Sequence, residues 1–345
     1  MARTREIVCE YQPYILGIPQ SPTQMHEQAC SNDGATIERW RDTWITNIRA
    51  NKLHFGDFKS KSLGNLFGKY RYRPMIVAGS GPSLKFNVED LKNRKDIPLI
   101  SCLHNFHFFE DHGIAPDYYV SLDAGPVTIE EVSEGGSKSE EEYWELTKDR
   151  TLIAFIGSHP DLLKKWRGKI YLYNAPVPDQ KFDDQLMEIE QFNVWCGNGG
   201  NVLGACLYIS KVMFGAAAQI FIGADFSFGY DRRFHSWDSK YDKTMGHCIK
   251  AVDVFGNPVL TWQSYFNFKT WFDYISIQVP GVYINATEGG CLGAYPEGNL
   301  HTIKQMDLAK AIDQFTMCDH VKDQVLNPGE AVAHEKYGTN KILLF

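Results

Sequence analysis

Short apolar runs recur along the chain from about residue 74 onward, and small or polar residues follow each of them. Runs that are apolar along their whole length are typical of strands covered on both faces in a parallel sheet. Segments with helical character lie between them, at 88–95, 103–112 and 199–214. The expected strands cover residues 75–79, 98–102, 118–123, 151–157, 169–174, 219–225 and 282–287. This alternation predicts an α/β, Rossmann-like fold, a mostly parallel sheet with helices on both faces.

The first 70 residues have a different pattern. Apolar residues recur there at spacings of three and four, which predicts an amphipathic packing helix. These residues are Ile37, Trp40, Trp44, Ile45 and Ile48. A connector at 59–73 follows, with five lysine and arginine residues. We therefore expect an N-terminal helical extension and connector over 1–70, a Rossmann-like nucleotide-binding catalytic domain over 71–310 and a C-terminal tail over 311–345.

Two segments interrupt the alternation of strands and helices. Residues 128–149 are acidic and polar, with a Gly-Gly-Ser centre. This composition predicts a solvated, mobile loop or excursion that needs no chemical role. The sequence Gly256-Asn257-Pro258 predicts a hairpin or turn, and the aromatic residues after it predict a helix.

Charge, apolar runs and cysteine spacing argue against several classes of protein. The net charge of −7 gives no general attraction to nucleic acid, so a DNA acceptor is not favoured, although the connector at 59–73 is a local basic strip. No apolar run of about 18 residues is present, and the N-terminus has no apolar signal region. The eight cysteines form no C-x-x-C pair and no Cys/His cluster. We expect a cytoplasmic protein with reduced thiols and without structural zinc.

The ends of the expected strands are the candidate site, because ligands of such sheets bind outside the carboxyl ends of the strands. The first end is followed by the turn Gly79-Ser80-Gly81-Pro82-Ser83. A glycine turn that opens a helix presents backbone N–H groups to an anion. The Lys-Ser/Thr ending of a Walker loop is missing, and Leu84 replaces the third glycine of a dinucleotide fingerprint. The turn is either a phosphate cradle or an ordinary corner.

A second turn, Gly197-Asn198-Gly199-Gly200-Asn201, precedes a helix and the strand that ends at Asp225. Gly199 and Asn201 are candidate anion-binding residues in this donor-rich turn. Asp225 is suited to hold a ribose hydroxyl, a metal or an incoming hydroxyl group. Its alternative role is to cap a helix or turn.

Charged residues follow this strand and the last one. Arg232 and Arg233 are candidates to face a phosphate group. His235 beside them is a natural general acid or base, and a surface histidine without a role is the alternative. Thr287 and Glu288, before Gly289-Gly290, form another polar strand end.

Five motifs occur in an order that resembles the MptE-like family, which includes motility accessory factor glycosyltransferases and archaeal 6-hydroxymethylpterin pyrophosphokinases. They are IVAGSGPSL, PDYYVSLD, IFIGADFSF followed by His235, GNPVLTW and YINATEGG, within roughly residues 70–310. The stretches Ala78–Lys85 and Asn105–Asp111 are also distantly similar to sialyltransferases of glycosyltransferase family 42.

The resemblance implies that a nucleotide, often part of a cytidine-monophospho sugar, binds at the 79–83 turn and at Asn105. It also implies tyrosine hydroxyls on the leaving phosphate, with Tyr230 and Tyr241 as candidates. A histidine acts as the base in such enzymes, and both His235 and His247 are candidates for it here.

We therefore expect a glycosyltransferase that moves a sugar from a CMP- or UDP-linked donor to a hydroxyl of a protein, a glycan or modified DNA. Asp123 and Asp225 would flank the sugar or a metal, and His235 would remove the proton of the acceptor hydroxyl. One alternative is a Mg²⁺-dependent pyrophosphokinase for a hydroxymethyl pterin, with the ion on Asp123, Asp225 or Glu288. The other is a non-catalytic nucleotide-binding module.

Overall fold

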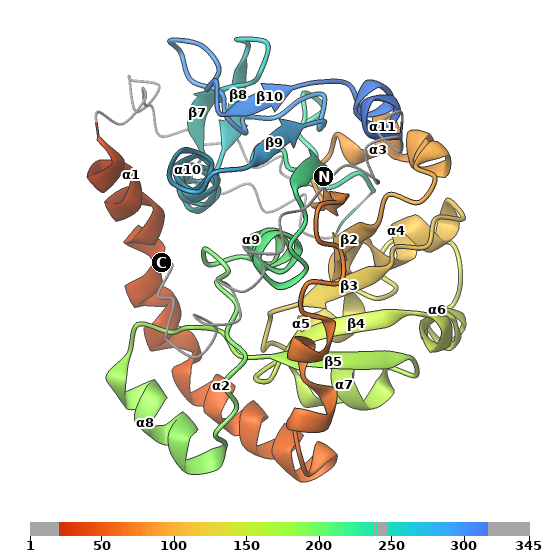
Figure 1. Ribbon diagram of the computed structural model, residues 1–345, viewed down its shortest axis with the longest axis vertical. Helices are drawn as coiled ribbons and strands as arrows, with labels where there is room; N and C mark the ends of the chain where they lie inside the picture. Colours follow the sequence, from red (N-terminus) through yellow and green to blue (C-terminus); the bar gives the residue numbers. More distant parts are fainter. Residues whose placement is uncertain (1–20, 238, 240–247, 317–345) are drawn as a thin grey trace, which may run out of the picture.

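An eight-stranded sheet forms the centre of the molecule, seen in a computed structural model that describes residues 21–237, 239 and 248–316 (Figure 1). Its strand order is β10-β9-β6-β1-β2-β3-β4-β5, and every neighbouring pair is parallel. The strands are β1 (Pro74–Ala78), β2 (Leu99–Cys102), β3 (Tyr118–Ser121), β4 (Thr151–Phe155), β5 (Lys169–Tyr173), β6 (Ala218–Ile222), β9 (Val282–Asn285) and β10 (Ile303–Gln305). The predicted Rossmann-like α/β fold is confirmed, including all seven expected strands.

Helices surround this sheet. They are α1 (Pro22–Ala29), α2 (Asp33–Phe55), α3 (Leu84–Asn87), α4 (Phe106–Asp111), α5 (Val127–Glu130), α6 (Glu140–Leu146), α7 (Pro160–Lys165), α8 (Gln180–Ile189), α9 (Val202–Tyr208), α10 (Gln263–Gln278) and α11 (Leu308–Thr316). The helix expected over 199–214 begins later, because Gly199 and Gly200 have positive φ angles and Asn201 caps α9 by accepting a hydrogen bond from the Gly204 N–H. It continues as one π-helical turn, Ile209–Met213.

Two other predicted segments appear with changed limits. Residues 88–93 form a 3₁₀ helix, and 103–112 divide into a 3₁₀ turn at 103–105 and α4. The expected hairpin is an antiparallel pair, β7 (Ile249–Val252) and β8 (Pro258–Thr261), and α10 is the aromatic helix after it. None of the described helices combines the length and the apolar character that a membrane span requires.

Helices α1 and α2 run along one side of the molecule, from α10 to α7 and α8 (Figure 1). The apolar stripe of α2 faces inward as predicted, since Ile45 and Ile48 are buried. Two buried amides on the same helix reach the sheet. Asn47 Nδ2 donates to the carbonyls of Ala124 and Gly157, at 3.0 and 3.1 Å. Asn51 Nδ2 donates to those of Ile156 and Ser158, at 2.8 and 2.9 Å. Helix α2 therefore fixes the loops at the carboxyl ends of β3 and β4.

The acidic segment 128–149 contains helix α6 and contributes buried residues, so the prediction of a solvated loop is wrong for this part of it. Ser139 and Glu142 form a capping box that starts α6. Tyr143 and Trp144 are buried, and the Tyr143 hydroxyl donates to Asp111 at 2.7 Å. Two aromatic side chains with core contacts outweigh the polar composition of the segment.

Most of the basic side chains of the connector at 59–73 contact other residues of the protein, although three of the five are exposed. Lys69 lies over the Tyr118 ring and donates to its hydroxyl at 2.6 Å. Arg73 pairs with Asp96 at 2.7 Å. These contacts lie where β1 and β3 begin, at the opposite edge of the sheet from the candidate site. The connector therefore offers no basic strip beside that site.

Candidate active site at the carboxyl edge of the sheet

The order of the strands creates a topological switch point between β1 and β6. From β1 the chain adds β2, β3, β4 and β5 on one side, and β6 then returns to the other side of β1. In open parallel sheets, ligands bind outside the carboxyl ends at such a point. The loops after β1, β2, β3 and β6 meet there, and they carry most of the residues predicted from the sequence.

The turn after β1 gives most of its backbone donors to the protein itself. The N–H groups of Gly79 and Gly81 donate to the carbonyls of Ile222 and Gly223, at 2.9 and 2.8 Å. A Cβ atom on Gly79 would overlap the Gly223 carbonyl, and one on Gly81 would overlap the Asp225 carboxylate. The glycines are therefore required by the close approach of β1 and β6. Phosphate binding by this turn stays a prediction.

Asp225 is buried against the same turn. Its carboxylate accepts hydrogen bonds from the Ser83 hydroxyl at 2.8 Å and from the Ser83 N–H at 3.3 Å. Burial raises the pKa of Asp225 to about 7, and the bonds from Ser83 oppose that rise. The residue thus caps the turn, which was its alternative role.

Asn105 joins the ends of β1 and β2. Its side-chain amide is buried and donates to the Gly79 carbonyl at 2.8 Å and to the Ser101 hydroxyl at 3.0 Å. Asn105 Oδ1 is buried and has no partner in the described structure. A contact with a base or ribose would have to use this oxygen, because both amide hydrogens are taken.

His235 approaches the turn from the loop after β6. Its Nδ1 lies 2.9 Å from the carbonyl of Ser80. A carbonyl only accepts, so Nδ1 carries the proton and Nε2 keeps its lone pair. The ring stacks on Trp237, with centroids 4.9 Å apart and planes 6° apart. Burial, followed by the nearby charge of His104, lowers the pKa of His235 to about 3. His235 is therefore a neutral imidazole whose Nε2 can accept a proton.

His104 stands beside His235, and its pKa is shifted in the opposite direction. The two rings have centroids 4.5 Å apart, and His104 Nε2 lies 3.3 Å from Glu134 Oε2. Burial acts to lower the pKa of His104, but the charges of Glu131, Glu134 and Asp123 raise it overall. Burial in turn raises the pKa of Glu131 to about 7 and also raises that of Asp123.

Sequence reasoning named only Asp123 from this group. His104 was visible as the residue before Asn105 at a strand end. Glu131 and Glu134 lie in the acidic segment that was predicted to be without chemistry. They approach His104 because the residues after α5 pack against 104–107, as the contacts of Glu134 with His104 and of the Glu131 carbonyl with His107 show, and no local pattern indicates this.

Four predicted site residues have structural roles here. Asn201 caps α9, and the nearby Gly199 packs closely against Trp271. The Thr287 hydroxyl accepts from the Ala224 N–H at 3.2 Å, and the Glu288 carboxylate accepts from the N–H of Leu308 at 3.0 Å. Their assignment to nucleotide binding stays a prediction.

The loop 229–233 is at the surface. Arg232 and Arg233 are exposed, and so is Tyr230, whose hydroxyl donates to Asp253. Tyr241 and His247, the other residues considered for phosphate and base roles, lie outside the described residues.

The difference in pKa between His104 and His235 is measurable. Lowering the pH from 8 to 5 should protonate His104 with a pKa above 6.5, because three carboxylates surround it. His235 should keep constant ring shifts over the same range, because its pKa lies near 3. Ring ¹H–¹⁵N NMR spectra measure both, with His235→Asn to assign the signal that disappears. Titration of His235 near pH 6.5 would contradict this account.

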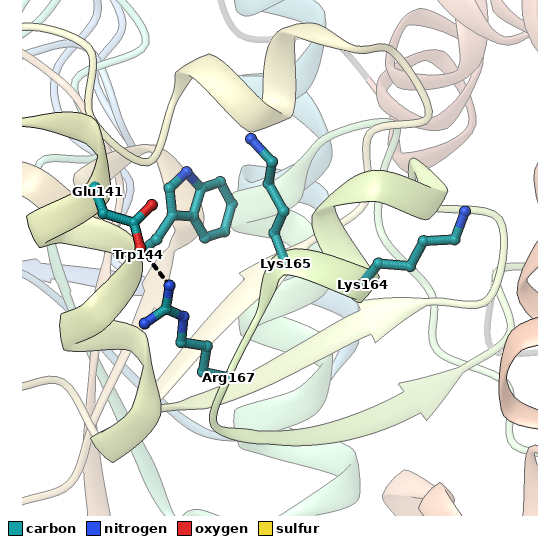
Figure 2. Close-up of a pocket in the computed structure, with 5 residues that line it drawn as sticks. All are labelled: Glu141, Trp144, Lys164, Lys165 and Arg167. Atoms are coloured by element: carbon teal, nitrogen blue, oxygen red, sulfur yellow. Dashed lines mark hydrogen bonds and ion pairs between the residues drawn. The ribbon is translucent and has the colours of Figure 1, made fainter.

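A surface hollow elsewhere does not belong to this site. Figure 2 shows it between Glu141, Trp144, Lys164, Lys165 and Arg167. These residues lie on α6, at the end of α7 and just before β5, near the amino ends of β4 and β5. Arg167 pairs with Glu141, and Lys165 pairs with Glu140, so acidic side chains balance the basic ones.

Comparisons with known proteins support this assignment of the fold. The sequence model of the MptE-like family, described as 6-hydroxymethylpterin diphosphokinase MptE-like, matches residues 51–231. No curated protein matches. The solved structure of the MAf glycosyltransferase from Magnetospirillum magneticum AMB-1 is similar, with a TM-score of 0.54 and 15% identity. That similarity covers 87% of this chain but 44% of the other, so this chain spans less than half of that structure. The family match extends over more than half of the 345 residues, and the chain therefore belongs to the MptE-like family.

Proposed function

We propose that this protein is a glycosyltransferase that moves a sugar from a CMP- or UDP-linked donor to an acceptor hydroxyl. The observation that carries the proposal is the pairing of two different imidazoles at the switch point. His235 offers an unprotonated Nε2, and His104 is held toward its charged form by Glu134. A proton acceptor beside a cation is what transfer from a phosphate-linked donor to a hydroxyl requires.

The donor phosphate would lie between the 79–83 turn and His104. A cationic His104 there would offset the charge that grows on the departing phosphate, and the exposed Arg232 and Arg233 would add to this from the surface loop. The buried Asn105 Oδ1 lacks a partner in the described structure and would accept a hydrogen bond from the nucleoside if donor binding uncovers it.

The proton of the acceptor would pass to His235 Nε2. As the new glycosidic C–O bond forms, the bond from the sugar carbon to the donor phosphate breaks, and the nucleotide leaves with that electron pair. The pKa of His235 near 3 reflects the protein groups alone. A bound phosphate brings negative charge next to the ring, and this raises the pKa of the imidazole.

Pyrophosphoryl transfer to a hydroxymethyl pterin is the second candidate, because the family description names that activity. It would need Mg²⁺, with Asp123, Asp225 and Glu288 as the predicted ligands. Two of these residues do not fit that role as placed. The Asp225 carboxylate already accepts a hydrogen bond from the Ser83 hydroxyl, and the Glu288 carboxylate accepts one from the Leu308 N–H. In the described part of the chain, no group of three or more His, Cys, Asp or Glu side chains is arranged to hold a metal ion.

Turnover assays separate these functions. The protein is incubated with CMP-, UDP- and GDP-sugars and with methyl glycosides, a serine-rich peptide or DNA as acceptors. A parallel reaction contains ATP, Mg²⁺ and 6-hydroxymethylpterin, and mass spectrometry follows the products. We expect nucleotide release and a glycosylated product from a CMP- or UDP-sugar. A pterin diphosphate as the sole product would contradict the proposal, as would nucleotide binding without any turnover.

A further inference from the structure

An aromatic surface borders the candidate site and has no role in the proposed chemistry. We call it the aromatic wall, and it consists of Phe234, Trp262 and Tyr265. The Phe234 ring lies 4.9 Å from Trp262 and 4.8 Å from Tyr265, and the latter two rings are 5.2 Å apart. All three side chains are half-buried and so keep surface open to solvent.

Neighbouring aromatic side chains and the start of α10 support the aromatic wall. Phe228 is buried and contacts the rings of Phe234 and Trp262, at 5.4 and 5.0 Å between centroids. Phe268 contacts Tyr265 at 5.7 Å. Because Trp262 and Tyr265 stand at the start of α10, the helix fixes their backbone. A ligand that stacks on these rings would therefore order few side chains on binding.

The wall continues the candidate site. Phe234 precedes His235 in the chain, and their ring centroids are 4.7 Å apart. Burial raises the pKa of the Tyr265 hydroxyl, and the charges of Asp123 and Glu131 raise it further. Asp123 itself is exposed to solvent, although enough protein surrounds it to raise its pKa as well. The geometry agrees, since His104 contacts both His235 and the Glu134 carboxylate, so acidic side chains lie beyond the His235 end of the wall.

Charge and shape decide which ligand suits this surface. Two carboxylates repel a phosphate but accept hydrogen bonds from hydroxyl groups. The ring planes of the wall are tilted by 38°, 35° and 61°, so together they form a curved face. A flat heterocycle could stack on only one of these rings. A pyranose has a puckered apolar C–H face and hydroxyl groups around its rim, which match the curved rings and the carboxylates.

We infer that the aromatic wall binds a pyranose ring, with Asp123 and Glu131 accepting hydrogen bonds from its hydroxyl groups. This inference rests on the proposed function for its place in the reaction. It adds that the sugar lies on the α10 side of His235, away from the phosphate at the 79–83 turn. The pyranose comes either from the donor or from an acceptor glycan.

Binding measurements on wall variants test the inference. The variants are Trp262→Leu and Phe234→Leu, the second because it lies in a loop and leaves the start of α10 intact. Trp195→Leu is the control, an exposed tryptophan after β5. Calorimetry compares UDP-N-acetylglucosamine and CMP-N-acetylneuraminate with free UDP and CMP. Saturation-transfer NMR follows methyl glycosides and 6-hydroxymethylpterin. Thermal unfolding confirms that each variant is folded.

The two sources of the sugar give different results. If the donor supplies it, the wall variants weaken binding of the sugar nucleotide about tenfold or more and leave that of free UDP or CMP within about twofold. If an acceptor supplies it, the variants remove the signals of the methyl glycosides, and the control keeps them.

Three results would overturn the inference: no sugar binds in either form, sugars bind equally well to the wall variants, or the pterin alone depends on the wall. Failure of the proposed function looks different. In that case no nucleotide binds, while methyl glycosides still require the wall.

Discussion

Replacing His235 by asparagine should lower the turnover number by about 10²–10⁴-fold, the usual contribution of general base catalysis. The asparagine amide can donate to the Ser80 carbonyl, as His235 Nδ1 does at 2.9 Å. The variant therefore retains the contact that holds the loop after β6 but lacks a nitrogen that can take a proton. We expect the affinity for the nucleotide to change little, so the loss should appear in kcat, measured by nucleotide release from the sugar donor.

The matched control is His54→Asn on the exposed face of α2. It removes an imidazole that lies outside the site, and turnover should stay at the wild-type level. A His235→Asn protein that folds and transfers sugar at the normal rate would remove His235 from the mechanism. His104 and the carboxylates around it would then be the remaining candidates for the general base.

Replacing Gly81 by alanine should have the largest effect on folding. The added Cβ would overlap both the Asp225 carboxylate and the Gly223 carbonyl, and the backbone carbonyl cannot rotate away. Relief requires β1 and β6 to separate, which would break the buried hydrogen bonds between Ser83 and Asp225. We expect a loss of about 3 kcal/mol or more in the free energy of unfolding, or failure to fold, measured by thermal or urea unfolding.

Gly34→Ala is the control for this change. Gly34 lies on α2, and a Cβ there would meet nothing within 4 Å. Alanine is the better helix former, so this variant should be neutral or more stable by up to about 1 kcal/mol. If Gly81→Ala behaved like Gly34→Ala, the close contact between the ends of β1 and β6 would be wrong.

The strands could be predicted from the sequence because continuous apolar runs have few alternatives in a chain of this length. Their ends were less predictable. The run 219–225 ends as a strand at Ile222, because Gly223 takes a φ of 56° and turns the chain. Strand β10 has three residues and showed no pattern of its own. Helix α6 depends on Tyr143 and Trp144, which find buried partners only in the folded protein.

Part of the candidate site could also be predicted from the sequence, because the carboxyl ends of parallel strands meet at one edge of the sheet. The rule that ligands bind at the carboxyl ends of the strands grouped the 79–83 turn, Asp225 and His235, and the structure places Asp225 against Ser83 and His235 against Ser80. That rule could not predict that Asp225 would accept hydrogen bonds from Ser83 across the switch point. Nor could it show that His104 would pair with Glu134, 30 positions along the chain. Such pairs depend on how loops fold over the sheet, and one sequence does not record that.

Hydrogen exchange measured with and without nucleotide tests the central claim, that the carboxyl edge between β1 and β6 is a nucleotide-dependent transfer site. The protein is exchanged alone and with CMP, UDP, GDP or ATP, and mass spectrometry follows its peptides. We predict slower exchange at 79–87, 103–112 and 223–237 with CMP or UDP, and no change around the hollow at 141–167. Slower exchange confined to other segments, or none with any nucleotide, would contradict the claim.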